Sequence, residues 1–194
     1  VANYPIFRSA VIARSRVTIK SFLQVCSAGL TTTSYHECIN PKFFNAEKIV
    51  RMYHDNQDNI LGLKIRQSEE LAEGLGIEPL KETVRIAGMA GCPVEVHCTN
   101  IPVPTSEVLK VLRPGDIFEH VYQGVKNTII DENCTTVSGR PGNGELSLTR
   151  QREGSTVILT SCLRPRNRDL LRICAVRTWC WEACSDAPFF HCQT

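Results

Sequence analysis

The feature that most limits the fold is a regular alternation of apolar, strand-like segments with helix-like segments. The strand-like segments are rich in β-branched and aliphatic residues and occupy residues 17–25, 60–66, 93–98 and 117–121. Between them, apolar residues recur at helical spacing in residues 46–57, 78–90 and 105–112. Apolar strands joined through helices by short connections predict parallel strands and an α/β architecture.

The composition changes near residue 133. Residues 1–133 hold seven Lys, seven Arg and 15 acidic residues, a net charge of −1, whereas residues 134–194 hold no Lys, eight Arg and five acidic residues, a net charge of +3. The second part also carries both Trp and six of the ten Cys. We therefore predict two parts, an α/β segment over 1–133 and an irregular Cys/Arg-rich tail over 134–194.

Charge and hydropathy argue against several classes of partner. The net charge of +2 gives no reason to expect nucleic acid as a partner, and no apolar run approaches 18 residues, so we expect no membrane span. The N-terminus does not read as a signal peptide, and we expect a cytoplasmic protein with free thiols.

A secreted, disulfide-bonded protein is the alternative interpretation of the cysteines. A zinc site among Cys174, Cys180, Cys184, His191 and Cys192 is disfavoured, because paired Cys-x-x-Cys spacing is missing.

Three polar residues accompany three successive apolar strands. Lys64, His97 and His120 lie toward the carboxyl ends of the predicted strands, the edge at which active sites of parallel α/β folds form. Two neutral imidazoles suit zinc, and a buried lysine becomes an anionic ligand if carbon dioxide converts it to a carbamate. The alternative is structural: a strand-end histidine is often only hydrogen-bonded, and a lysine in an apolar strand often extends to the surface.

Five sequence blocks resemble the amidohydrolase superfamily, in particular its dihydroorotase-like deacetylases. They are GLKIR at 62–66, GIEPLK at 76–81, PVEVH at 93–97, EVL and LRPGD within 107–116, and EHVYQG at 119–124. The resemblance runs from about residue 6 to residue 133. It implies a (β/α)8 barrel, of which this chain shows about the third to the sixth strand.

The resemblance also implies a site. Lys64 would be the carboxylated lysine that bridges two zinc ions, His97 and His120 would be further metal ligands, and Asn100 would lie in a loop that borders the substrate. The substrate would be a small molecule with a cyclic amide, N-acyl or acyl-ester bond, and water activated by the metals would cleave that bond.

Two family features are missing from the chain. The His-x-His pair of the first strand would precede Val1, and the proton-accepting aspartate of the eighth strand has no match in the tail, where Asp169 and Asp186 follow no suitable strand. The catalytic residue therefore stays unassigned. Because the resemblance stops abruptly at Asn133, we hypothesise that the tail is read from a shifted frame, with a divergent extension as the alternative.

Two functions follow from these observations. The first is a metal-dependent hydrolase represented by an incomplete chain. The second is a catalytically inactive remnant without an enzymatic role. Because a partial barrel leaves strand edges unpaired, we expect the remnant to associate into homo-oligomers.

Overall fold

The computed structural model describes residues 1–26, 37–72, 74–120, 123–129, 146–149 and 156–159. The helices are α1 Tyr4–Ala10, α2 Ala46–His54, α3 Glu69–Ala72, α4 Glu78–Ala90 and α5 Thr105–Val111, with short 3-10 turns at Ile12–Arg14 and Pro41–Phe43. The strands are β1 Ser21–Gln24, β2 Ile60–Arg66, β3 Val94–His97, β4 Ile117–Glu119, β5 Leu146–Thr149 and β6 Thr156–Leu159.

One sheet organises these elements, in the order β1-β2-β3-β4-β6-β5. The first four strands run parallel, as the alternation of strands and helices predicts, and β6 joins β4 antiparallel, with β5 beyond it. The antiparallel pair is a feature that the sequence analysis did not predict, although residues 155–159 have the composition of a strand. The other residues of the tail, including its two Asp, its six Cys and the predicted boundary at 133, lie outside the described residues.

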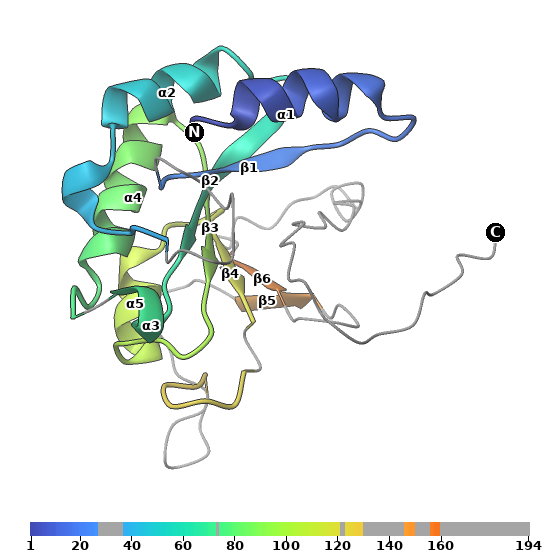
Figure 1. Ribbon diagram of the computed structural model, residues 1–194. Helices are drawn as coiled ribbons and strands as arrows, with labels where there is room; N and C mark the ends of the chain where they lie inside the picture. Colours follow the sequence, from blue (N-terminus) through green and yellow to red (C-terminus); the bar gives the residue numbers. More distant parts are fainter. Residues whose placement is uncertain (27–36, 73, 121–122, 130–145, 150–155, 160–194) are drawn as a thin grey trace, which may run out of the picture.

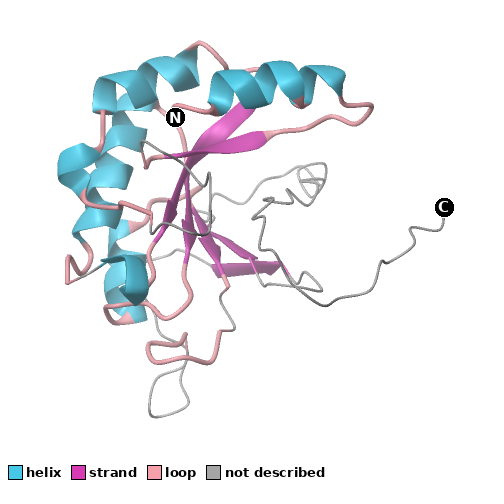
Figure 2. Ribbon diagram, in the orientation of Figure 1, coloured by secondary structure: helices cyan, strands magenta, loops and turns pink. Residues whose placement is uncertain are grey.

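The helices gather on one face of the sheet (Figures 1 and 2). Helix α4 packs on β2 and β3 and contributes Leu80, Ile86 and Ala87 to a core that also holds Leu63 and Val96 from those strands. Because side chains alternate along a strand, Leu63 and Ile65 of β2 and Val94 and Val96 of β3 enter this core, and the residues between them face the other way. The apolar core therefore lies between helices and sheet.

Helix α4 shows how closely local sequence decides these elements. Glu78 and Pro79 stand in its first turn, where an acidic side chain meets the positive end of the helix and the missing N–H of proline is harmless. Gly91 ends the helix with a left-handed backbone, φ 71°, which glycine adopts without strain. The predicted range 78–90 is confirmed to the residue.

Other features were predicted less completely. Helices α1 and α3 were not anticipated, because α1 is mostly exposed and α3 has only four residues, so neither shows an apolar period. Cys26, Cys38, Cys92 and Cys98 are free thiols, as expected for the first part of the chain. Among the described helices, none is long and apolar enough to cross a membrane.

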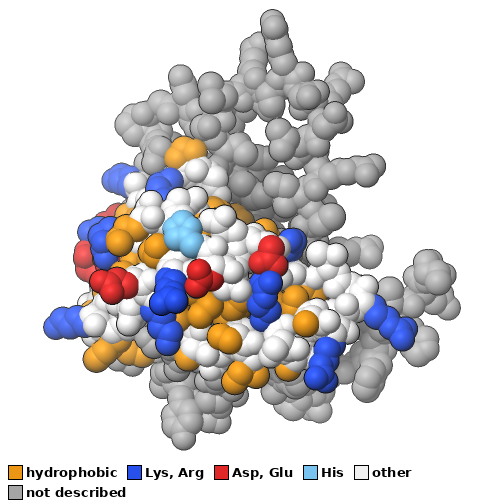
Figure 3. All heavy atoms as spheres, turned by 90° about the horizontal axis from the view of Figure 1, so that it is seen from above, with side chains coloured by type: hydrophobic (Ala, Val, Ile, Leu, Met, Phe, Trp, Pro, Cys, Tyr) orange, Lys and Arg blue, Asp and Glu red, His pale blue; other side chains and the backbone are white. Residues whose placement is uncertain are grey.

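The surface seen from above mixes both signs of charge. Figure 3 shows basic and acidic side chains interspersed among hydrophobic ones on this face of the molecule. The exposed hydrophobic side chains include Ile6, Phe7 and Val11 of the N-terminal region and Phe43.

Candidate metal centre

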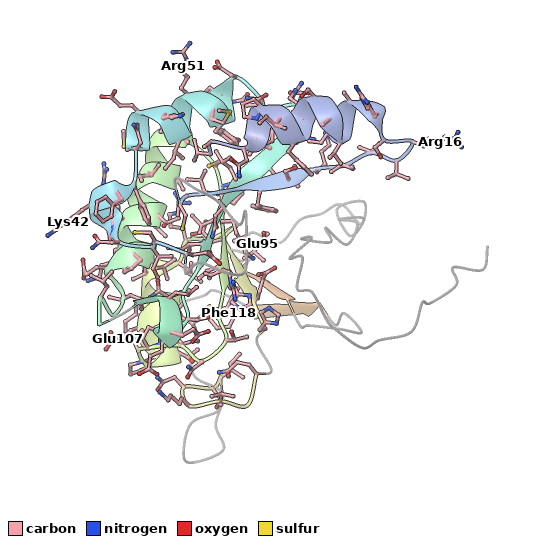
Figure 4. The ribbon with its side chains drawn as sticks, in the orientation of Figure 1. Arg16, Lys42, Arg51, Glu95, Glu107 and Phe118 are labelled. Carbon is pink, nitrogen blue, oxygen red and sulfur yellow. The ribbon has the colours of Figure 1, made fainter. Side chains whose placement is uncertain are left out.

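The face of the sheet that points away from the helices carries a row of polar side chains. Strand register places Lys64 of β2 beside Glu95 of β3, and His97 of β3 beside Glu119 of β4. Glu95 lies near the middle of the molecule in Figure 4, whereas Arg16, Lys42 and Arg51 lie at its periphery. Three neighbouring parallel strands thus bring acidic, basic and imidazole groups together on one buried surface.

Lys64 is buried and held by two carboxylates. Its side chain is only 5% exposed, and its Nζ forms ion pairs with Glu119 and, at 3.6 Å, with Glu95. The alternative interpretation of this lysine, that it extends to the surface from an apolar strand, is wrong. A buried ammonium needs compensating charge, and Glu95 on the adjacent strand β3 and Glu119 on β4, the strand beyond it, supply that charge.

His97, the last residue of β3, is oriented from both sides of its ring. Its Nε2 hydrogen-bonds the Thr99 hydroxyl at 2.8 Å, and that hydroxyl lies 3.3 Å from the Ser68 hydroxyl. Its Nδ1 lies 3.9 Å from Glu119 Oε2. Burial, followed by the nearby His120 and the positive charges of Arg66 and Lys64, lowers the pKa of His97 to about 3. The ring is therefore neutral near pH 7, which is the form that binds a metal ion.

His120 reaches the same site through an unusual backbone conformation. It follows the end of β4 and has φ 55°, in the left-handed region that side chains other than glycine seldom adopt. In a regular strand, residues 119 and 120 would point to opposite faces. Instead, the His120 ring packs edge-on against His97, with ring centroids 4.4 Å apart and an interplanar angle of 74°. Such local strain is typical of functional sites.

Glu119 connects the predicted site residues. Donor atoms of His97, Glu119 and His120 all lie within 4.8 Å of one another, and Glu119 is also the ion-pair partner of Lys64. Burial raises the pKa of Glu119, but a hydrogen bond with Glu95 and the charge of Lys64 outweigh it and lower the pKa to about 2. The carboxylate is therefore ionised near pH 7.

The three predicted metal ligands thus belong to one cluster, and two glutamates of that cluster were missed by sequence reasoning. The signal for Glu95 was present: in the segment VEVH it precedes His97 by two positions, so strand alternation places both on one face. Glu119 gave no such signal, because its position beside His97 depends on strand register, and its closeness to His120 depends on a backbone turn.

Asn100 lies in the loop that follows β3, next to Thr99. Its side-chain Nδ2 donates to the Glu70 carboxylate at 3.2 Å, and its backbone carbonyl oxygen accepts from the Glu69 backbone amide. Its backbone is left-handed, φ 48°. Its Oδ1 is buried and has no hydrogen-bond partner among the described residues. Asn100 is therefore next in the chain to Thr99, the residue that hydrogen-bonds His97. Its own hydrogen bonds connect the loop to α3.

A second ion pair lies next to the cluster. Arg66, the register partner of His97, donates from Nη1 to Glu37 Oε1 at 2.7 Å, and Gln24 donates to the other oxygen of Glu37. Burial raises the pKa of Glu37, and the charge of Arg66 opposes that effect. These contacts connect Glu37 to the ends of β1 and β2.

Comparison with curated proteins found deacetylases. A deacetylase of Agrobacterium fabrum is 34% identical over 133 residues, which are 68% of this chain and 33% of that protein. A deacetylase of Brucella anthropi is 32% identical over the same shares of both chains. The chain thus spans about one third of the length of the curated relatives it matches. No family model matches the chain.

Comparison with solved structures found the same architecture. A dihydroorotase matches with a TM-score of 0.62 and 34% identity over 66% of this chain and 34% of that one. An adenine deaminase matches with a TM-score of 0.63 and 20% identity over 71% of this chain and 37% of that one. The parallel sheet is therefore part of an α/β barrel of the TIM type, and the predicted partial barrel is confirmed.

Proposed function

Because the chain belongs to the amidohydrolase superfamily, we propose that it is part of a metal-dependent hydrolase that acts on a small molecule with a cyclic amide, N-acyl or acyl-ester bond. The observation that supports this proposal is the buried cluster of two imidazoles, one lysine and two carboxylates on the strands of a partial barrel. The chain spans one third of its relatives, so the activity proposed is that of a whole protein of this kind.

The residues present suit a metal ion. The pKa of His97 keeps its ring neutral, His120 is turned toward it, and an ionised carboxylate lies beside both. Imidazole nitrogen and carboxylate oxygen are ligands that zinc accepts. We propose that Lys64, His97 and His120 are the metal ligands, that the metal is zinc, and that carboxylated Lys64 bridges two ions in the complete site.

A bound divalent cation would supply Lewis acidity, which polarises a substrate carbonyl and makes water a better nucleophile near neutral pH. The residues of this chain have separate tasks. Thr99 and Ser68 hold the His97 ring in place, which favours one tautomer and one orientation. Asn100 is proposed to contact the substrate from the loop after β3. The residue that accepts the proton of the attacking water is not assigned in this chain.

The experiment is a metal analysis of the purified chain combined with hydrolysis assays. We expect about two zinc ions per chain in wild type when bicarbonate is present, and loss of bound zinc in Lys64→Ala. Lys81→Ala is the matched control, because Lys81 is exposed and its ion pair is with Glu78 in its own helix. N-acetyl amino acids, cyclic amides and acyl esters form the substrate panel.

The alternative function is a catalytically inactive remnant. The four parallel strands among the described residues are half of the eight strands of the complete fold, and the same experiment tests this alternative. A chain that binds no zinc, hydrolyses no member of the panel and forms oligomers would support the remnant and contradict the hydrolase.

A further inference from the structure

The loop that follows β4 crosses the carboxyl edge of the sheet and contacts the loops that follow β3 and β2. Residues 123–129 of this loop, which we call the strap, lie toward the lower end of the molecule in Figure 1. At its start, the Gln123 amide donates to the backbone oxygen of His120 at 2.9 Å. At its end, Ile129 is buried in the main core. Both ends of the strap are therefore fixed, and any movement is confined to the residues between them.

Asn127 holds the second half of the strap against the loop after β3. Its Nδ2 donates to the Ile101 carbonyl oxygen at 2.9 Å, and its backbone oxygen accepts from the Thr105 hydroxyl at 2.8 Å. The same backbone oxygen accepts from Gln123 Nε2 at 3.0 Å, which closes the strap on itself. Because Ile101 and Thr105 are buried, salt in the solvent screens these hydrogen bonds very little.

The tip of the strap, residues 124–126, is held in a different way. Val125 is 53% exposed, and the side chain of Lys126 is 55% exposed. Among the described residues, the ion pair of Lys126 with Glu69 is the only hydrogen bond or ion pair that joins this tip to a residue outside the strap. Glu69 is the first residue of α3, and its amide donates to the Asn100 oxygen in the loop after β3. A single exposed ion pair therefore decides whether the tip rests on α3.

We propose that the tip is a latch with two conformations. In the closed conformation Lys126 pairs with Glu69, and in the open conformation the tip leaves α3 while Asn127 keeps the rest of the strap in place. The latch controls the access of small molecules to the carboxyl edge of the sheet. This role in access rests on the proposed function, whereas the two conformations are properties of the chain alone.

Two opposing effects leave the closed conformation only slightly favoured. An exposed ion pair contributes little to stability, because water and salt screen its charges. Lys126 also has φ 52°, in the left-handed region, which costs free energy in a residue with a side chain. Opening the latch loses the ion pair and relieves this strain, so both conformations are populated.

The places where the backbone is strained support a role at this edge. Among the described residues other than glycine, those with positive φ are Asn100, His120 and Lys126, and all three follow β3 or β4. Strained backbone of this kind clusters at sites that bind ligands or change conformation. His120 belongs to the polar cluster on the sheet, but Lys126 does not. The latch accounts for the strain at Lys126, which the polar cluster leaves without a role.

The test is methyl NMR spectroscopy of the full chain, isotope-labelled at the valine methyl groups, without added metal. The Val125 methyl groups report the surroundings of the tip, and relaxation dispersion measures exchange between the two conformations. Glu69→Gln removes the ion pair, and we expect the ratio of open to closed chains to rise about two- to fivefold, as for the loss of one exposed ion pair. Concentrated sodium chloride should produce the same change in wild type and little further change in the variant.

Glu78→Gln is the matched control. Glu78 also lies in the first turn of a helix, and its exposed ion pair is with Lys81, which is not part of the strap. This variant should leave the Val125 signals and their salt dependence unchanged.

Two substitutions of Lys126 separate the charge from the strain. Lys126→Gln and Lys126→Asn both remove the ion pair, but asparagine adopts a left-handed backbone more readily than glutamine. We therefore expect the open conformation to be less populated in Lys126→Asn than in Lys126→Gln. Equal populations in the two variants would overturn the part that we assign to backbone strain.

The remaining outcomes separate the latch from the proposed function. Val125 signals that respond neither to Glu69→Gln nor to salt overturn the latch, whether or not the chain hydrolyses a substrate. For any substrate that is hydrolysed, kcat/KM should rise about twofold or more in Glu69→Gln, in step with the open population, and an unchanged kcat/KM overturns the control of access. A chain that hydrolyses nothing, while Val125 responds as expected, overturns the proposed function and the control of access and leaves the two conformations standing.

Discussion

Lys64 illustrates how much a single residue depends on its neighbours. From the sequence, a lysine within an apolar strand is either a buried functional residue, such as a metal ligand, or a residue whose side chain extends to the surface. In the structure it is buried between Glu95 and Glu119, so its charge is compensated by residues from two other strands. Removing one partner of such a buried ionic group leaves uncompensated charge in the interior.

We predict that Lys64→Met destabilises the fold by about 3 kcal/mol or more, because two buried carboxylates lose their cation. The measurement is urea unfolding followed by circular dichroism. Lys81→Met is the control, since its exposed pair with Glu78 contributes only about 0.5 kcal/mol. Equal midpoints for the two variants would show that the Lys64 ion pairs do not stabilise the chain.

The cysteines allow a prediction about pH. Burial is the first cause that raises the pKa of Cys92 to about 11 and of Cys26 to about 12. An unfolded thiol ionises near pH 9, so the stability linked to these raised pKa values is present below pH 9 and is lost as pH rises toward 11 and 12. Below that range the folded chain keeps both residues as thiols, which react slowly.

We therefore expect iodoacetamide at pH 8 to label Cys38, which is exposed, far faster than Cys26 and Cys92. Mass spectrometry of the digested chain identifies each labelled site. In 8 M urea the three rates should converge. Labelling of Cys92 in the native chain at the rate of Cys38 would mean that β3 and its neighbours open readily.

At the scale of elements, local sequence predicted those with a clear period and clear end signals. Helix α4 and strand β2 match the predicted ranges 78–90 and 60–66. Strand β1 is shorter than the predicted 17–25, because only Ser21–Gln24 pair with β2. A residue joins the sheet only where the neighbouring strand offers a backbone partner in register. The register of two strands is set by the loops and helices that connect them.

Gly62 shows that a residue within one strand can also depend on a neighbouring strand or loop. A Cβ at this position would lie 2.4 Å from the Pro93 carbonyl oxygen, which accepts a hydrogen bond from the Leu63 amide and so anchors the start of β3. The glycine is therefore required by the close approach of a neighbouring backbone, which nothing in the segment ILGLKIR reveals.

We predict that Gly62→Ala destabilises the chain by about 2 kcal/mol, because the Pro93 carbonyl must shift and the pairing of β2 with β3 weakens. Gly124→Ala is the control: apart from the residues next to it in the chain, no atom of the described residues lies within 4 Å of its added Cβ, and we expect a change within about 0.5 kcal/mol. Thermal unfolding of both variants measures the difference. Equal stabilities would show that the strand accommodates the methyl group without strain.

At the scale of the molecule, the two predicted parts of the chain meet in one sheet. The predicted division at residue 133 stays a prediction, but β6, from the second part, pairs with β4 from the first. An exposed parallel edge favours association between chains, and an added antiparallel strand covers such an edge.

We predict that a chain ending at residue 133 associates more strongly than the full chain, because removal of β6 exposes the edge of β4. Sedimentation velocity over a range of concentrations measures the association, and circular dichroism checks that the helices remain. A shortened chain that stays monomeric, with an unchanged spectrum, would contradict a role of β6 at the sheet edge and support an independent segment over 1–133.

The sequence by itself determined the order of β1 to β4 and of the helices α2, α4 and α5 between them, the parallel arrangement of those strands, and the position of Lys64, His97 and His120 in or directly after successive strands. These properties follow from periodicity and chain order, which are local. Only the tertiary structure decided that Glu95 compensates Lys64 and that Glu119 stands between His97 and Lys64. Those contacts join residues of different strands, and strand register and the turn at His120 are set by packing across the whole sheet.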